Sequence, residues 1–359
     1  LPTTCRRQRQ MCIRDRISRT QMNTDEININ SIRAKANKLS EYIIHTPTTS
    51  LHSAVISKLM SGCKIFLKLE CMQHTGTFKA RGAISVASEI SKEQKKFGVT
   101  AASAGNHAIA SAWAARKLEM SAHVVMQSSA NPFRIKAAEA HGAKITLKEA
   151  GAPLFAEAER LVKDEKRTFI HPFEGVHTSL GASGVGLELM DDIENLDAVI
   201  VSVGGGGLIS GVAAAVKEIN PNCKVYGVEP IGANSMSQSI MNGQPVTLEK
   251  VDTIADSLSP PMSLPFGLAL CQKYVDEIVT IDDDFICAGM TLFQEEAKLA
   301  VEPAAGAVMA GMLGPLRSKL QNKRVGLIVC GANIDANSYS LLLSRGKTNI
   351  EKLVSNYAC

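Results

Sequence analysis

The chain has 359 residues, 45% of them hydrophobic, which is enough apolar material for two modest α/β domains. Its formal net charge of +4 arises in residues 1–21, which carry +5, so the rest of the chain is close to neutral at about −1. This balance argues against a nucleic-acid-binding body, and no apolar run is long enough to cross a membrane.

The basic segment 1–21 matches no fold pattern. Such a segment is also compatible with nucleic-acid binding or with a transit peptide. We interpret it as appended sequence, with Met22 as the candidate native start. After it, short apolar runs alternate with helical stretches. This alternation is typical of parallel sheets that carry helices on both faces.

The first candidate for chemistry is Lys79, in the run Gln73–Ala83. It follows the strand-like run 64–70 and stands where the chain turns into a helix. Partial loss of solvation at such a junction lowers the pKa of a lysine and makes its amine nucleophilic. The ordinary alternative is a lysine at a helix start that faces solvent.

The second candidate is the run 103–107, Ser-Ala-Gly-Asn-His, which precedes an Ala-rich helix predicted over 108–118. Small and polar residues at a helix start leave backbone N–H groups free, and these groups suit a carboxylate. An ordinary helix cap would satisfy the same composition.

The third candidate is a run of four glycines, 204–207, between a buried strand at 198–203 and a helix at 209–218. Glycines at a strand–helix junction let the backbone approach a phosphate closely. Neither register fits the G-x-G-x-x-G pattern, because Ile209 or Ser210 would stand last, and no Gly-Lys-Ser/Thr is present. The sequence therefore indicates one cradled phosphate rather than a dinucleotide or a nucleoside triphosphate.

The fourth candidate is Cys330, at the end of the strand predicted over 325–330. Ligands of α/β sheets bind at the carboxyl ends of strands, although cysteine is also a common buried residue. The nine cysteines form no C-x-x-C pair and the eight histidines show no zinc spacing. We therefore expect reduced thiols, a cytoplasmic protein and no catalytic zinc.

Together these motifs resemble the fold-type II pyridoxal-phosphate enzymes (tryptophan synthase β-like), in the branch of the serine/threonine dehydratases (threonine ammonia-lyases) and serine racemase. The resemblance runs from about Ile43 to Arg345. It implies an α/β fold with two doubly wound parallel-sheet domains. The expected large cofactor-binding domain covers 22–96 plus 167–345, the small domain 97–166 is nested inside it, and 346–359 form a C-terminal tail.

The resemblance also implies roles for individual residues. Lys79 forms the Schiff base with pyridoxal phosphate, Phe78 packs against the ring, and Asn106 hydrogen-bonds the ring hydroxyl. Glu302 lies near the ring and Cys330 faces the pyridine nitrogen. The phosphate is bound by Gly204, Gly205, Gly206, Gly207 and Leu208. The substrate carboxylate is held by Ser103, Ala104, Gly105, Asn106 and His107.

Four departures from the family bear on the reaction. Cys330 is not a carboxylate and should not protonate the ring nitrogen, which favours elimination over transamination. Ala104 replaces the serine that acts as second base in serine racemase, and Phe155 aligns with its carboxylate-binding arginine. Family members that act on threonine usually have Ala-Asp-Gly at the positions that match residues 255–257, which are Ala-Asp-Ser in this chain. A bulkier or acidic substrate is therefore an alternative.

The sequence thus predicts a cytoplasmic homodimer or homotetramer, a dehydratase in amino-acid catabolism that converts threonine or serine to a 2-oxo acid and ammonia. Alternatives are a phenylserine or 3-hydroxyaspartate dehydratase, a serine racemase, or an inactive binding protein of the same fold. A structural Mg²⁺ or K⁺ is also open, with Glu229 as the candidate ligand. The family's metal site otherwise matches Ala233 and Ser235, which are weak or absent ligands.

Overall fold

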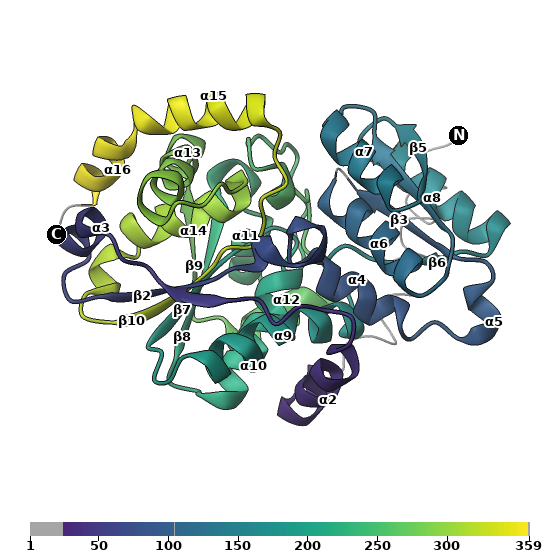
Figure 1. The fold of residues 1–359 in the computed structure, drawn as a ribbon, viewed down its shortest axis with the longest axis horizontal. Helices are drawn as coiled ribbons and strands as arrows, with labels where there is room; N and C mark the ends of the chain where they lie inside the picture. The colour runs from purple at the N-terminus through teal and green to yellow at the C-terminus, as the bar shows by residue number, and fades with distance from the viewer. Residues whose placement is uncertain (1–23, 104, 358–359) are drawn as a thin grey trace.

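The computed structural model describes residues 24–103 and 105–357, which fold into one sheet of six strands and one of four (Figure 1). The predicted basic tail 1–21, Met22 and Ala104 lie outside the described residues. All but one of the strand pairings in the two sheets are parallel. The predicted fold class, α/β with two parallel sheets, is confirmed.

The larger sheet has the strand order β1-β2-β10-β7-β8-β9. Its strands are β1 (Thr48–Ser50), β2 (Lys64–Lys68), β7 (Ala198–Ser202), β8 (Lys224–Pro230), β9 (Glu277–Ile281) and β10 (Arg324–Ile328). The edge strand β1 pairs antiparallel with β2, and its three polar residues gave no apolar pattern to predict it from. The last strand, β10, lies between β2 and β7, so segments from the two ends of the chain are neighbours in the sheet.

Helices cover both faces of this sheet (Figure 1). One face carries α9 (Val176–Asp192) and α10 (Gly207–Ile219), and the other carries α13 (Asp283–Leu292) and α14 (Pro303–Leu313). Every residue of α14 is buried, as expected of a helix that is apolar all round. This part also contains α2 (Ile29–Leu39), α3 (Ala54–Leu59), α4 (Lys79–Ala87), α11 (Ser235–Asn242) and α12 (Pro265–Tyr274).

The smaller sheet has the order β5-β4-β3-β6 and lies beside the larger one in Figure 1. Its strands are β3 (Val99–Ser103), β4 (Ala122–Gln127), β5 (Lys144–Lys148) and β6 (Thr168–Phe169), joined by α6 (Asn106–Lys117), α7 (Pro132–Ala140) and α8 (Ala152–Glu165). The short helix α5 (Lys92–Lys95) precedes β3. The sheet therefore ends at Phe169, just beyond the domain boundary expected at 166.

Alternation along the strands separates the two faces of the smaller sheet. Ala101 and Val124 pack in a cluster with α6, whereas the next residues, Ala102 and Val125, pack in a second cluster with α8. Successive side chains of a strand point to opposite faces, so each helix layer receives every second residue. On α8 the buried residues follow helical spacing: Leu154, Ala158 and Leu161.

The C-terminal segment 346–359 is folded as far as the structure describes it. Helix α15 (Ala336–Lys347) continues into it, and α16 (Ile350–Asn356) follows. Leu353 is fully buried in the core of the larger unit, and Arg317 donates a hydrogen bond to the Val354 carbonyl oxygen. This segment is therefore part of the large unit's packing.

Within the residues that the structure describes, no helix combines the length and apolarity needed to cross a bilayer. The described cysteines are all free thiols, namely Cys63, Cys71, Cys223, Cys271, Cys287 and Cys330.

Candidate active site

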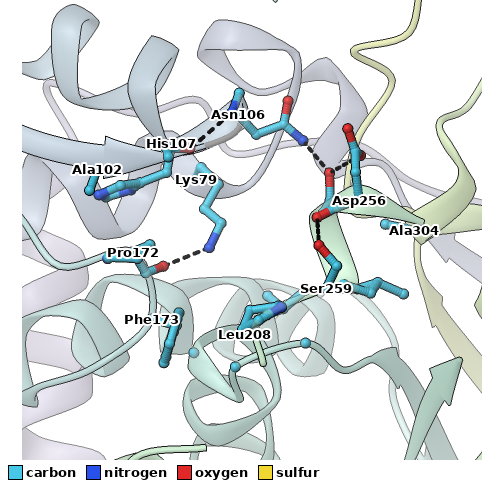
Figure 2. Close-up of a pocket in the computed structure, with 18 of the residues that line it drawn as sticks. Lys79, Ala102, Asn106, His107, Pro172, Phe173, Leu208, Asp256, Ser259 and Ala304 are labelled. Atoms are coloured by element: carbon cyan, nitrogen blue, oxygen red, sulfur yellow. Dashed lines mark hydrogen bonds between the residues drawn. The ribbon is translucent and has the colours of Figure 1, made fainter. Parts of the chain in front are cut away.

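A cavity of about 270 Å³ opens where the carboxyl ends of strands from both sheets converge. Parallel strands end at the same edge of a sheet, and ligands bind there. The structure brings nearly all of the predicted site residues into this one cavity (Figure 2). Those that line it are Phe78, Lys79, Ser103, Gly105, Asn106, His107, Gly204, Gly205, Gly206, Gly207, Leu208, Glu302 and Cys330.

Lys79 is the first residue of α4, and its amine points into the cavity. The preceding residue is tied to the end of the larger sheet, because the Phe78 N–H donates to the Cys330 carbonyl oxygen at 3.0 Å. Lys79 Nζ donates to the Pro172 carbonyl oxygen at 2.6 Å (Figure 2). Burial lowers the pKa of Lys79 to about 8, and attraction from the Glu302 carboxylate opposes part of this shift. The amine is thus substantially neutral at mildly basic pH.

Helix α4 is fixed below the cavity by a fully buried arginine, Arg81. Its Nε and Nη2 donate to the two Glu70 oxygens at 2.7 and 2.8 Å, and its Nη1 and Nη2 donate to the two Glu188 oxygens at 2.7 Å. Lys68 Nζ lies 2.8 Å from Glu188 as well. We call Arg81, Glu70, Glu188 and Lys68 the Arg81 cluster. Two bidentate pairs hold a guanidinium in one orientation, so the helix that begins with Lys79 is held firmly.

Two histidines lie next to Lys79 and are neutral. Burial, with added repulsion from Lys79, lowers the pKa of His107 and of His171 to about 3. His107 Nε2 donates to the Ile170 carbonyl oxygen at 2.8 Å. His171 Nδ1 accepts from the backbone N–H groups of Phe173 and Glu174 at 3.2 and 3.0 Å. His171 was missed by the sequence reasoning because no motif surrounds it.

The glycine run forms the start of α10. Gly206, at the N-cap, has φ 91° and has no side chain to cap the helix, so within the described residues no N-cap side chain bonds the first N–H groups of α10. A Cβ on Gly205 would stand 2.4 Å from the Phe173 ring, and a Cβ on Gly207 would stand 2.7 Å from the Phe173 backbone. Only glycines allow this close approach. Free N–H groups at an uncapped helix start suit one phosphate.

Asn106 and Glu302 join the two units across the cavity. Asn106 Nδ2 donates to both oxygens of Glu302 at 2.9 Å and to Ser257 Oγ at 3.1 Å. Asn106 Oδ1 accepts from Asn333 Nδ2 at 3.0 Å. Burial raises the pKa of Glu302, although attraction from Arg134 opposes the rise.

Cys330 lies two residues beyond the end of β10 and is buried. Its sulfur accepts a hydrogen bond from Ser202 Oγ at 3.4 Å. Burial raises the pKa of the thiol, with further repulsion from Glu302, so Cys330 is a neutral thiol.

Arg134, on α7, also reaches into the cavity and was missed. It forms an ion pair with Asp256, and its Nε and Nη2 donate to the Asn333 carbonyl oxygen at 3.0 and 2.9 Å. Its Nη2 lies 3.8 Å from Glu302. A Cβ on Gly105 would stand 2.3 Å from Arg134 Cδ, so the side chain lies directly along the run 103–107. No sequence signal marks an arginine inside an ordinary helix.

One wall of the cavity is apolar. Phe155, which aligns with the racemase arginine, lines it from α8 together with Leu154. The facing loop, between the short 3-10 turn Asp256–Leu258 and α12, contributes its own apolar side chains. These are Pro260, Pro261, Met262 and Leu264.

Glu229, the candidate metal ligand, lies outside this cavity at the end of β8. Its oxygens accept from the Met236 and Ser237 N–H groups at 2.9 Å, at the start of α11, and from the Ser237 hydroxyl. Burial raises its pKa to about 7. Among residues 24–103 and 105–357, no group of three His, Cys, Asp or Glu side chains is arranged to hold a metal. The carboxyl group thus caps a helix, and its role as a metal ligand stays a prediction.

The residues present fit the predicted cofactor. A lysine amine of lowered pKa lies in the same cavity as an uncapped glycine loop that only glycines can form. Pyridoxal phosphate needs these two groups, an amine for its aldehyde and N–H donors for its phosphate. The individual roles of the lining residues remain predictions.

Comparison with known proteins places the chain in a family. Residues 39–331 match the pyridoxal-phosphate dependent enzyme family. A phenylserine dehydratase of Ralstonia pickettii is 39% identical over 91% of this chain and 100% of its own length. An L-threonine ammonia-lyase of Thermotoga maritima is 35% identical over 87% of this chain and 77% of its own. The structure of maize serine racemase has a TM-score of 0.82 at 32% identity, covering 89% of this chain and 98% of that chain.

Proposed function

The chain belongs to the pyridoxal-phosphate dependent enzyme family, and from this premise we propose that it is an ammonia-lyase for a β-hydroxy-α-amino acid. The β-hydroxyl leaves as water, and hydrolysis of the dehydrated product gives a 2-oxo acid and ammonia. The observation that carries the proposal is that Lys79, with its lowered pKa, shares a cavity with the glycine loop and the run 103–107.

Lys79 is the base in this proposal. Its Nζ, neutral in part near pH 8, accepts the proton from the α-carbon of the substrate. When bound, pyridoxal phosphate supplies the electron sink that makes this proton removable. The proton gained by Lys79 Nζ is then available to the departing hydroxyl, which leaves as water. Lys79 thus returns to its neutral form without a second base.

The other residues bind and orient. The free N–H groups at the start of α10 hold the phosphate, and those at the start of α6, after Gly105, hold the substrate carboxylate. Asn106 would hydrogen-bond the ring hydroxyl of the bound cofactor. Cys330, as a neutral thiol, leaves the ring nitrogen without a negative partner.

Two residues favour elimination over racemisation. Racemisation needs a second proton donor on the face opposite Lys79, and the chain has Ala104 where serine racemase has a serine. The arginine of serine racemase is replaced by Phe155, which lines the cavity. Neither residue can transfer a proton or pair with a carboxylate.

Threonine or serine is one substrate candidate, and a β-aryl amino acid such as phenylserine is the second. The apolar wall of Leu154 and Phe155, together with Met262 of the facing loop, favours the second, because these side chains offer an aromatic ring a surface to pack on. The same cavity disfavours 3-hydroxyaspartate. Apart from Lys79, the one always-charged cation among its described lining residues is Arg134, and Asp256 and Glu302 already neutralise it.

The assignment as an enzyme is tested with Lys79→Ala. Purified wild-type protein should show the visible absorbance of bound pyridoxal phosphate and release ammonia from hydroxy amino acids. Lys79→Ala should lose both, because the variant lacks the amine and the base. Lys92→Ala, at an exposed lysine on α5, is the matched control and should behave as wild type. Ammonia release at the wild-type rate by Lys79→Ala, or a colourless wild-type protein, would contradict the proposal.

The substrate is tested with a panel of threonine, serine, phenylserine and 3-hydroxyaspartate, scored by kcat/KM for ammonia release. Phe155→Ala should reduce the preference for phenylserine over threonine by about tenfold, because a ring contact is lost from the apolar wall. Phe133→Ala is the control, since Phe133 is 45% exposed, close to the 43% of Phe155, but lies outside the cavity lining. An unchanged preference in Phe155→Ala would leave threonine and serine as the substrates.

A further inference from the structure

A second, much smaller chamber lies beside Lys79, between α4 and α9. It encloses about 10 Å³, which is room for a single water molecule. Much of its lining is apolar, but it also contains polar groups that a water would serve. The lining residues are Phe78, Lys79, Gly82, Ala83, His107, His171, Pro172, Thr178, Ala182 and Gly207.

Thr178 provides the clearest sign that the chamber is wet. It is the third residue of α9, its methyl group packs toward Gly82, and it is only 6% exposed. Its hydroxyl oxygen is buried and makes no hydrogen bond within the described part of the chain. A buried hydroxyl without a partner is unfavourable, and in native proteins such groups are usually served by an ordered water.

The hydrogen-bonding state of the two histidines complements this hydroxyl. Because the Ile170 carbonyl oxygen can only accept, His107 Nε2 carries the proton and its Nδ1 is a bare acceptor. Because His171 Nδ1 accepts two backbone N–H groups, its Nε2 carries the proton and is a donor. Neither His107 Nδ1 nor His171 Nε2 has another partner among the residues that the structure describes. Both rings line the chamber.

We propose that this chamber binds one water molecule, which hydrogen-bonds Thr178 Oγ1, His171 Nε2 and the amine of Lys79, so that Thr178 and His171 position the amine through it. The polar groups match what one water requires. It accepts from His171 and from Lys79, and it donates to Thr178 Oγ1 and His107 Nδ1. Four partners, two of each kind, complete its hydrogen bonding.

The water has a consequence for proton binding at Lys79. The protonated amine has one acceptor, the Pro172 carbonyl oxygen, among the described residues. The groups that face it are His107 on α6, His171 after β6, Cys330 after β10 and Glu302 at the start of α14, and both histidines are neutral. The water supplies a second acceptor and so favours the protonated form. Loss of the water should therefore lower the pKa of Lys79.

The first test is structural. A crystal structure of the holoenzyme at a resolution that defines single waters should contain one water within hydrogen-bond distance of Thr178 Oγ1 and His171 Nε2. The same water should be present in Thr178→Ser, which keeps the hydroxyl, and absent in Thr178→Val, which is nearly isosteric but lacks it. A dry chamber in the wild-type protein overturns the proposal, whatever the variants do.

The second test measures the amine. The full-length protein is stripped of cofactor, and the rate at which it takes up pyridoxal phosphate is followed by visible absorbance against pH. The rate should rise through about pH 8 in wild type and in Thr178→Ser, and its midpoint should fall by about 0.5 to 1 pH unit in Thr178→Val. An unchanged midpoint together with a higher Tm in Thr178→Val would mean that the Thr178 hydroxyl has no water partner in the wild-type protein. That result would overturn the proposal.

The expected effect on Lys79 rests on the proposed function, in which this amine reacts with the cofactor. The presence of the water does not depend on that function. The two failures are distinguishable. If no form of the protein takes up pyridoxal phosphate, the proposed function fails and the crystal structure still decides the water. If uptake is normal but the water is missing, only the water proposal fails.

Discussion

Two arginines of this molecule each pair with two carboxylates, yet they work in different surroundings. Arg81 is wholly enclosed within the larger unit, with its two partners Glu70 and Glu188 at 0% and 13% exposure. Arg134 lies in the cavity, where it joins the smaller unit to Asp256, which is 49% exposed, and to the Asn333 carbonyl oxygen. The Arg81 pairs are enclosed next to α4, whereas the pair of Arg134 with Asp256 depends on the position of one partly exposed loop.

This difference suggests that one arginine contributes mainly to stability and the other mainly to ligand binding. A buried charge that loses its partner costs several kcal/mol, because it has no water to replace the partner. The pair of Arg134 with Asp256 contributes less to stability, because Asp256 is 49% exposed and solvent screens the pair, although Arg134 itself is only 6% exposed. The Arg81 cluster should therefore govern folding, and Arg134 should govern how the cavity handles its ligand.

The largest expected effect is that of Arg81→Met. Removing the guanidinium takes away the cation that pairs with the buried Glu70 and leaves Glu188 with Lys68 as its remaining cationic partner, so the free energy of unfolding should fall by about 3–5 kcal/mol. Urea denaturation measures the change. Arg160→Met is the control, since Arg160 pairs with Glu157 on the surface of α8 and should cost less than about 1 kcal/mol. Equal losses in the two variants would erase the distinction drawn between the arginines.

A smaller effect on stability, but a marked one on the ligand, is expected of Arg134→Met. The loop that carries Asp256 loses its tie to α7, so the KM for the best amino-acid substrate should rise about tenfold, equivalent to about 1.4 kcal/mol. Lys136→Met, at an exposed position on the same helix, should leave KM unchanged. The comparison breaks if Arg134→Met unfolds the protein as readily as Arg81→Met while its KM stays the same.

The smallest expected effect concerns acid. Burial raises the pKa of Glu188, but hydrogen bonds from Arg81 and attraction from Arg81 and Lys68 outweigh it, so the pKa is lowered in the folded state. A lowered pKa means that the ionised group stabilises the fold at neutral pH, and that this contribution disappears as the pH falls below about 4.5. Tm is measured at pH 7, 5 and 4. The decrease in Tm from pH 7 to pH 4 should be a few degrees smaller in Arg81→Met than in wild type. Parallel curves would show that the cluster does not carry this dependence.

Some of the site was accessible from the sequence because its signals are contiguous. Lys79 and the four glycines each stand in a short run next to a strand, and they converge because parallel strands end together. The resemblance rested on those runs, and the family and fold class are confirmed. The strand predicted over 325–330 is β10, which ends at Ile328, so Cys330 lies two residues beyond the strand and not at its last position.

The remainder could not be predicted because it depends on pairs of distant residues. Arg134 and Asp256 are 122 positions apart, and Arg81 and Glu188 are 107 apart. A single sequence holds no signal for such pairs, because each member alone has the appearance of a surface charge. His171 and Thr178 were missed for a related reason. These residues matter because each has a hydrogen-bonding atom without a partner among the described residues, and only the three-dimensional packing shows this.

The position of β10 has a consequence for how the protein is made. This strand is the last of the larger sheet to be synthesised, yet it fills the gap between β2 and β7. Until it leaves the ribosome, a nascent chain exposes two unpaired strand edges, and such edges invite association with other chains. The anchor from Phe78 to Cys330 is also missing until then. Lys79 therefore gains this anchor only after β10 has been synthesised, so cofactor capture should follow closure of the sheet.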